Sequence, residues 1–276
     1  MEKESQKYTN KIKETLAAKA AQCTEKDKLG KLMKILNGEL TDKLYLQFLK
    51  KNNHTDMLLI NQIKDSIGTK NSMLHSATVW CNGVMNAYTT NDAFLRDNIS
   101  WAGNATNWNR FMVTSTLGMI HMGNKSQAEE ILNPYFAGAA GGGGQQDGGN
   151  SPYSAAGAYY AYGLIHANQY TQECANFLKD GYRNSGQNEA VQHGVSLGLG
   201  LVAMGTKDED IYEELKNTLY NNADSAIIGE AAAYGMGMVM LGSADEKAIE
   251  EMTTHAVDSQ HEKIIRALSI SLALLM

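Results

Sequence analysis

The sequence predicts an all-α protein in which helical hairpins repeat to form an α-α superhelix or toroid, preceded by a short helical rod. Three observations predict this fold. A nine-residue box recurs along the chain, small residues recur at fixed places inside it, and a helix-capping residue type follows each copy. Self-similarity at a period of about 20 to 50 residues is typical of a repeat array.

The box is clearest at 197–205, which reads Leu-Gly-Leu-Gly-Leu-Val-Ala-Met-Gly, and it returns 37 residues later at 234–242. Weaker copies occupy 80–88, 115–123 and 160–168. We take the last residue of each box as an anchor. Successive anchors are 35, 45, 37 and 37 residues apart: Tyr88, Gly123, Asn168, Gly205 and Gly242. The repeat is therefore about 35 to 37 residues long, with one insertion.

Two columns of small residues run through the boxes. Five residues before each anchor is a glycine: Gly83, Gly118, Gly163, Gly200 and Gly237. Seven residues before it is another small residue: Cys81, Thr116, Ala161, Gly198 and Gly235. Helical residues two apart point to nearly opposite sides, so the columns mark two faces of one helix. Because glycine inside a helix costs roughly 1 kcal/mol relative to alanine, its recurrence indicates close approach of neighbouring backbones. A loose glycine-rich linker would not keep aliphatic pairs such as Leu201 and Val202 in register.

A second helix is expected to follow each box. Three residues after each anchor stands a residue of the type that caps helix N-termini: Asn91, Ser126, Thr171, Asp208 and Asp245. Apolar residues then follow at helical spacing. We therefore expect the box helix to end at the anchor and an amphipathic helix to begin three residues later.

The chain divides into three predicted parts. Residues 1–28 are polar and mixed in charge, which is typical of a flexible lead or a frayed helix. Residues 29–70 carry helical hairpins that form a rod, and residues 71–276 form the array. Within the array, 136–152 is a glycine-rich loop inserted between two repeats, which accounts for the spacing of 45. The last repeat is expected to be truncated, because the chain stops before its anchor.

Composition excludes several classes of function. The net charge is -6 with no basic cluster, which argues against binding to a nucleic-acid backbone. The three cysteines, Cys23, Cys81 and Cys174, are isolated, so we expect reduced thiols in an intracellular protein rather than a disulfide framework or zinc site. The first residues lack a secretory signal, and the apolar stretches fall short of the ~20 residues that span a bilayer.

Two patterns could suggest chemistry, and both are better explained by packing. Residues 198–203 fit a Gly-x-Gly-x-x-Ala dinucleotide fingerprint, but that fingerprint works only between a strand and a helix. His121 and His166 share a repeat column, yet no carboxylate or cysteine keeps a fixed distance from them. We therefore predict no catalytic residue, no cofactor and no metal site.

The box within a helix hairpin of this length resembles the proteasome/cyclosome repeat. That repeat occurs in the two large non-ATPase scaffold subunits of the proteasome regulatory particle and in the largest subunit of the anaphase-promoting complex. The resemblance covers residues 30–276, and it is closest to the larger of the two scaffold subunits. The segments that carry this closer resemblance are 94–101, 105–108, 163–168, 193–200 and 260–266.

The resemblance implies a rod that leads into a closed ring with two concentric layers of helices. It implies a non-catalytic subunit of the cytoplasm and nucleus, in contact with lid subunits, a deubiquitinase module and the ATPase ring. In that family a C-terminal tail holds a ubiquitin receptor. No residue of this chain matches that tail or the later repeats, so receptor docking and ring closure are not assigned to its residues. The glycine-rich insert also departs from the family pattern.

Two alternatives remain open. The chain could be a module that binds ubiquitin, a ubiquitin-like protein or another ligand on the concave or inner face of the array. A charged inner face would favour that function, whereas small apolar side chains would favour a structural one. It could also resemble the smaller proteasomal scaffold or the anaphase-promoting complex subunit, although the tryptophan-containing segments within 94–108 argue against both.

Overall fold

The computed structural model describes residues 6–20, 24–67, 72–136, 151–222 and 224–276. All regular secondary structure in these ranges is helical, which confirms the all-α prediction. No helix in them has the length and hydropathy needed to cross a membrane. Cys23 and nearly all of the predicted glycine-rich insert lie outside the described residues. Of the other two cysteines, Cys81 is exposed, Cys174 is buried, and both are free thiols.

The chain forms two compact units, Met1–Asn53 and His54–Met276. The first contains α1 (Gln6–Lys19), α2 (Lys26–Leu36) and α3 (Glu39–Lys51). The predicted polar lead is thus helical over α1 and the start of α2. Gly38, with a φ of 78°, makes the turn between α2 and α3. Neither α2 nor α3 fully buries a side chain, because their apolar residues alternate with lysines and few other helices pack on them.

The boundary between the two units differs from the predicted one. The rod was expected to extend to residue 70, but α4 (Met57–Ile67) belongs to the second unit and packs on α5 (Ser72–Met85). Ile60 of α4 is buried in the core of that unit. Helix α4 has apolar residues that pack on the array but carries no copy of the box. Because the box was the mark of the array in the sequence, α4 was grouped with the helices before it.

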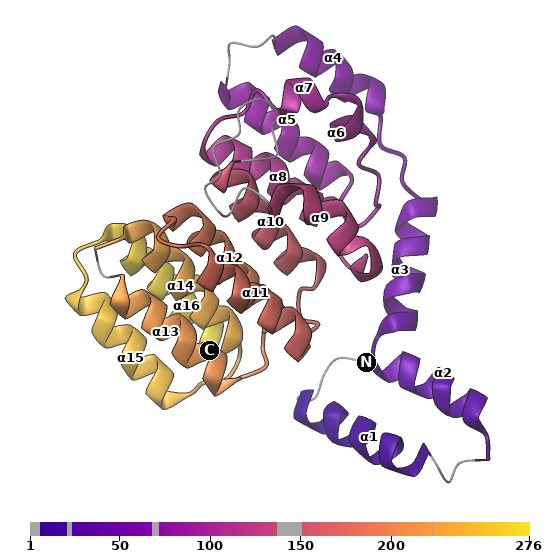
Figure 1. The fold of residues 1–276 in the computed structure, drawn as a ribbon, viewed down its shortest axis with the longest axis vertical. Helices are drawn as coiled ribbons and strands as arrows, with labels where there is room; N and C mark the ends of the chain where they lie inside the picture. Colours follow the sequence, from indigo (N-terminus) through magenta and orange to yellow (C-terminus); the bar gives the residue numbers. More distant parts are fainter. Residues whose placement is uncertain (1–5, 21–23, 68–71, 137–150, 223) are drawn as a thin grey trace. The chain divides into compact units, whose positions relative to one another are not determined.

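The second unit is an array of hairpins with two layers (Figure 1). One layer consists of what we call the box helices, because each carries a copy of the box: α5, α8 (Trp108–Ile120), α10 (Pro152–Ile165), α12 (Glu189–Val202), α14 (Ala226–Val239) and α16 (Glu262–Leu275). Each box helix packs on the next. This succession is the helical-repeat superhelix predicted from the period.

The other layer consists of what we call the second helices. They are α6 (Ala93–Asp97) with α7 (Ile99–Ala102), α9 (Ala128–Phe136), α11 (Gln172–Asn184), α13 (Glu209–Asn221) and α15 (Glu246–Asp258). From α9 onward, each second helix packs on the box helix that follows it in the chain. The hairpins therefore interlock, because every box helix from α10 to α16 contacts both helices of the preceding repeat.

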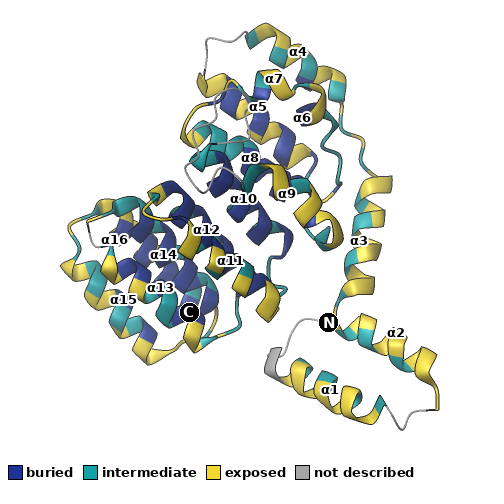
Figure 2. Cartoon of the chain, viewed as in Figure 1, coloured by how far each residue is buried: buried dark blue, intermediate teal, exposed yellow. Residues whose placement is uncertain are grey.

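Burial separates the two layers, as Figure 2 shows. Box helices such as α12 bury most of their residues, whereas α15 buries only Ala248 and Met252. Each second helix from α9 onward buries at least one large aliphatic or thioether side chain: Leu132, Leu178, Leu215 and Met252, all at most 2% exposed. The core thus combines small residues from one layer with large aliphatic residues from the other.

Replacing Gly200 by alanine tests the close contact. A Cβ at this position would lie 2.6 Å from the Cα of Gly235. We expect the variant to lower the unfolding free energy by roughly 1 to 2 kcal/mol, because overpacking outweighs the better helix propensity of alanine. Thermal unfolding followed by circular dichroism measures the effect.

Gly30→Ala is the matched control. Gly30 also lies inside a helix, α2, but nothing stands within 4 Å of an added Cβ. This variant should be neutral or slightly stabilising. If Gly200→Ala were equally harmless, the glycine column would not be explained by close packing.

Candidate functional site

The repeat interface is the candidate functional site, and glycines form its centre. The glycine column of each repeat faces the second small column of the next. A Cβ added at Gly118 would lie 2.5 Å from the Cα of Ala161. The same contact recurs in five pairs: Gly83 with Thr116, Gly118 with Ala161, Gly163 with Gly198, Gly200 with Gly235, and Gly237 with Ser271. An added Cβ would collide with its neighbour in four of these pairs, and at Gly83 it would lie in tight contact, 3.0 Å from the Thr116 side chain.

The second small column has neighbours of its own. A Cβ on Gly198 would lie 2.6 Å from the carbonyl oxygen of Tyr159 on α10 and 3.3 Å from Leu178 on α11. A Cβ on Gly235 would lie 3.0 Å from Leu215 on α13. Small residues here let the box helix approach both helices of the preceding repeat. In α16 the column holds Ser271, whose hydroxyl donates to the Ala233 carbonyl oxygen at 2.8 Å.

The anchors form a second repeated feature, in the turn after each box helix. All five have positive φ: 64° at Tyr88, 81° at Gly123, 56° at Asn168, 69° at Gly205 and 61° at Gly242. Their backbone N–H groups donate to carbonyls in the last turn of the next box helix, for example from Gly205 to Met238 at 2.9 Å. The last four carbonyls of a helix lack partners within it. The preceding repeat thus supplies donors for them.

We call this set of bonds the turn ladder. Its anchor bonds join Tyr88 to Met119, Gly123 to Ile165, Asn168 to Leu201, Gly205 to Met238, and Gly242 to Leu274, at 2.9 to 3.1 Å. Residues two positions after three anchors donate a second bond: Thr90 to Ile120, Lys207 to Val239, and Ala244 to Leu275, at 2.9 to 3.1 Å. The ladder joins consecutive repeats through backbone atoms alone.

The turn ladder also corrects one prediction. The box helix was expected to end at the anchor, but α12 ends at Val202, before Gly205, and α14 ends at Val239, before Gly242. A residue with positive φ cannot continue a right-handed helix, and only glycine and, less easily, asparagine adopt that conformation at low cost. The residues of the anchor column therefore form the turn after each box helix and are not part of the helix packing.

The predicted N-caps divide into two groups. Thr171, Asp208 and Asp245 lie at the N-caps of α11, α13 and α15, and their side chains accept bonds from backbone N–H groups at 2.8 to 3.2 Å. Asn91 and Ser126 do not occupy that position. Asp92 directly precedes α6, although Asn91 Oδ1 still accepts from the backbone N–H of Ala93, the first residue of α6, at 3.4 Å. Ser126 lies within the 3-10 helix η2 (Lys125–Gln127), ahead of α9. The earlier repeats diverge here because short helical pieces replace a single long second helix.

The box helices have caps that the sequence analysis missed. Ser151, Asn188 and Ser225 cap α10, α12 and α14, and each side-chain oxygen accepts from a backbone N–H in the first turn. These residues are 37 positions apart, so the repeat period contained the signal. Together with the caps of the second helices, they fix where each helix of the hairpin begins.

The two histidines of the shared column sit at the C-caps of α8 and α10 and are buried. His121 Nε2 lies 3.4 Å from Asp92 Oδ2, and this contact holds the pKa of Asp92 below its usual value. His166 Nδ1 lies 3.0 Å from the Tyr162 carbonyl oxygen, and burial lowers the pKa of His166. In the described part of the chain, no three His, Cys, Asp or Glu residues gather as metal ligands would.

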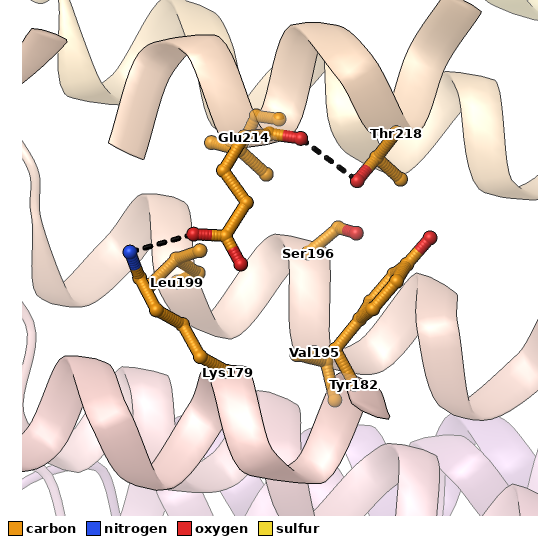
Figure 3. Close-up of a pocket in the computed structure, with 8 residues that line it drawn as sticks. Lys179, Tyr182, Val195, Ser196, Leu199, Glu214 and Thr218 are labelled. Atoms are coloured by element: carbon orange, nitrogen blue, oxygen red, sulfur yellow. Dashed lines mark hydrogen bonds and ion pairs between the residues drawn. The ribbon is translucent and has the colours of Figure 1, made fainter. Parts of the chain in front are cut away.

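A small pocket lies among α11, α12 and α13 (Figure 3). Lys179 and Glu214 point toward each other across it, with their charged atoms 2.6 Å apart. The buried Ser196 hydroxyl has no hydrogen-bond partner among the described atoms. The pocket encloses about 10 Å³, enough for a single water at most. Its ion pair ties two second helices together, and it has no room for a substrate.

A charged network joins the next pair of second helices. Lys216 on α13 lies 2.6 Å from Glu213 and 3.1 Å from Glu251 on α15. Lys247 on α15 also contacts Glu213, at 3.0 Å, and the Tyr212 hydroxyl donates to Glu251 at 3.0 Å. Bonds from Lys216 and then Lys247 lower the pKa of Glu213. The charged side chains thus connect neighbouring repeats.

Comparisons with known proteins find the same repeat length and relatives that align with about nine tenths of this chain. The family model described as "Proteasome/cyclosome repeat" matches residues 194–228 and 231–265, which begin 37 residues apart. The chain is similar to the 26S proteasome non-ATPase regulatory subunit 1 homolog A of Arabidopsis thaliana, with 47% identity over 251 residues. That alignment covers 91% of this chain and 24% of the relative.

Two further relatives agree. The 26S proteasome regulatory subunit rpn2 of Schizosaccharomyces pombe is 40% identical over 247 residues, which cover 90% of this chain and 25% of the relative. The 26S proteasome non-ATPase regulatory subunit 1 of Drosophila melanogaster is 41% identical over 248 residues, which cover 90% of this chain and 23% of the relative. The chain spans about a quarter of the length of these relatives.

Substitutions of Gly205 test the turn ladder. Alanine at φ 69° should lower the unfolding free energy by roughly 1 to 2 kcal/mol, because a Cβ disfavours the left-handed region. Asparagine, the residue at the equivalent anchor 168, should cost clearly less. Nothing lies within 4 Å of an added Cβ, so crowding cannot explain a difference. Urea unfolding of both variants measures it, and equal effects would contradict the role of the positive φ.

Alanine substitutions distinguish true caps from residues that merely fit the spacing. Thr171→Ala removes the oxygen that accepts from the Cys174 N–H and should cost about 1 kcal/mol. Ser126→Ala changes an exposed residue of η2 and should stay within about 0.5 kcal/mol of the parent. Urea unfolding compares the pair. A loss at Ser126 as large as that at Thr171 would overturn the corrected cap assignment.

Proposed function

We propose that this chain is part of a non-catalytic scaffold of the proteasome regulatory particle, because two of its repeats match the proteasome/cyclosome repeat model and most of its length is similar to named regulatory subunits. In this role it holds other subunits in position for ubiquitin-dependent protein degradation. Similarity to named regulatory subunits over nine tenths of the chain is the observation that carries the proposal.

The packing of the array supports a scaffold role. The glycine contacts and the turn ladder join each repeat to the next through the recurring residues. Ion pairs also join α11 to α13 and α13 to α15. A stack of repeats in which each contacts its neighbours presents long surfaces at fixed separations. Such an array is better suited to holding partner proteins in position than to catalysing a reaction.

The proposed partners are other subunits of the regulatory particle: the lid, the deubiquitinase module and the ATPase ring. The proposed compartments are the cytoplasm and the nucleus, where the resemblance places this family. Docking of a ubiquitin receptor belongs to a tail that the resemblance does not match to residues of this chain. We therefore assign receptor docking to no residue here.

The alternatives receive less support. The box helices meet through small residues, which favours a structural inner layer over a charged surface that binds ubiquitin. The relatives described above carry proteasomal names, which favours the proteasome over the anaphase-promoting complex.

Affinity purification of the protein that carries this chain tests the proposal. We expect lid and ATPase subunits of the regulatory particle to co-purify. A Gly200→Leu version should recover less of them, because a large side chain against Gly235 disrupts the array. Gly30→Ala, at an open position, should recover the parental amount. Recovery of cell-cycle ligase subunits in place of proteasome subunits would instead favour the anaphase-promoting complex.

A further inference from the structure

A second pocket lies where four box helices begin. It encloses about 240 Å³, far more than the pocket of Figure 3. Its walls come from the first residues of the helices and from the loop before α12. The side chains used in the argument below are Trp108, Pro152, Tyr153, Gln187, Glu189 and Ile227. None of them belongs to the glycine contacts or to the turn ladder.

One wall of the pocket is aromatic. The ring of Trp108 meets that of Tyr153 edge to face, with centroids 5.3 Å apart, and Trp108 remains 37% exposed. Behind it, Trp108 also contacts Phe111 and His193, at 5.4 and 5.1 Å. Phe111 in turn stacks on Tyr160 at 5.7 Å. These ring contacts hold Trp108 in place, so its indole forms a fixed surface for a bound group.

The charge at this pocket is negative. Glu189 is exposed and is the only one of the lining side chains that carries a charge at neutral pH. His193, behind the aromatic wall, donates from Nδ1 to the Ile227 carbonyl at 2.8 Å if that nitrogen carries the proton. Burial lowers the pKa of His193, so the ring is neutral at pH 7 and adds no positive charge.

An anion is a poor occupant, although helix N-termini generally attract anions. At α10, Pro152 has no N–H and the Tyr153 N–H is bonded to Ser151. At α12, the Val191 N–H is bonded to Asn188. The Glu189 carboxylate would then repel any anion that approached the remaining N–H groups. The caps of α10 and α12 and the charge of Glu189 therefore oppose the usual attraction of helix N-termini for anions.

We propose that this pocket binds an arginine side chain from a partner protein. A guanidinium group stacks on an aromatic face and forms paired hydrogen bonds with a carboxylate. Trp108 and Tyr153 supply the aromatic faces, Glu189 supplies the carboxylate, and the side-chain oxygen of Gln187 supplies a further acceptor. The segment 137–150 contains no lysine or arginine, so it is not the source of the cation. This inference does not rest on the proposed assembly.

The probe is the peptide acetyl-Gly-Arg-Gly-amide, and its neutral match replaces arginine by citrulline. The chain has three tryptophans, so its ¹⁵N spectrum carries three indole N–H signals, and Trp108→Phe identifies the one of interest. We expect the arginine peptide to shift the Trp108 signal in a saturable way. The citrulline peptide should bind at least tenfold more weakly, because citrulline keeps the shape and loses the charge.

Variants of two glutamates complete the test. Glu189→Gln should weaken the arginine peptide at least fivefold. Glu209→Gln is the matched control, because Glu209 is also an exposed first residue of a helix, α13, but lies outside the pocket. It should leave the affinity unchanged, and the remaining peaks report that both variants are folded. Equal binding of the citrulline peptide, no effect of Glu189→Gln, or tighter binding of acetyl-Gly-Glu-Gly-amide would overturn the proposal.

Discussion

The structure depends on the distance between successive box helices. Five glycines of successive box helices face residues of the next box helix at positions where an added Cβ would collide or be tightly packed. Once the helices lie this close, their C-terminal carbonyls come within reach of the preceding turn, and the turn ladder forms. The large aliphatic residues of the second helices then fill the remaining space. Packing density inside proteins leaves few voids, so these three features are interdependent.

The repeat and its glycine column could be predicted from the sequence because they depend on a period and on side-chain size. Both are visible in one chain: Gly163, Gly200 and Gly237 stand 37 residues apart and are followed by aliphatic pairs. The partner of each glycine could not be predicted. That Gly200 meets Gly235, and not another small residue, depends on how far each hairpin advances along the array.

The anchors were identified as a column but assigned the wrong role. Glycine at 205 and 242 and asparagine at 168 can end a helix or occupy a turn beyond it, and composition alone does not separate the two. Ser126 was misjudged for a related reason. Its type and spacing fit a cap, but the 3-10 helix η2 moves the start of α9 to residue 128. Ser151, Asn188 and Ser225 could not be separated from turn residues by type alone, because serine and asparagine are also common in turns.

The pocket at Trp108 could not have been predicted from columns of like residues, because the side chains that line it come from different repeats and differ in type. Trp108, Tyr153 and Ile227 occupy equivalent places before their boxes, but their side chains differ from repeat to repeat, whereas the glycine column is constant. This contrast follows from the physical roles of the two sets. A residue that sets the distance between helices must be small in every repeat. A residue at the mouth of a pocket is free to differ, and the proposed arginine pocket depends on side chains that vary in this way across several repeats.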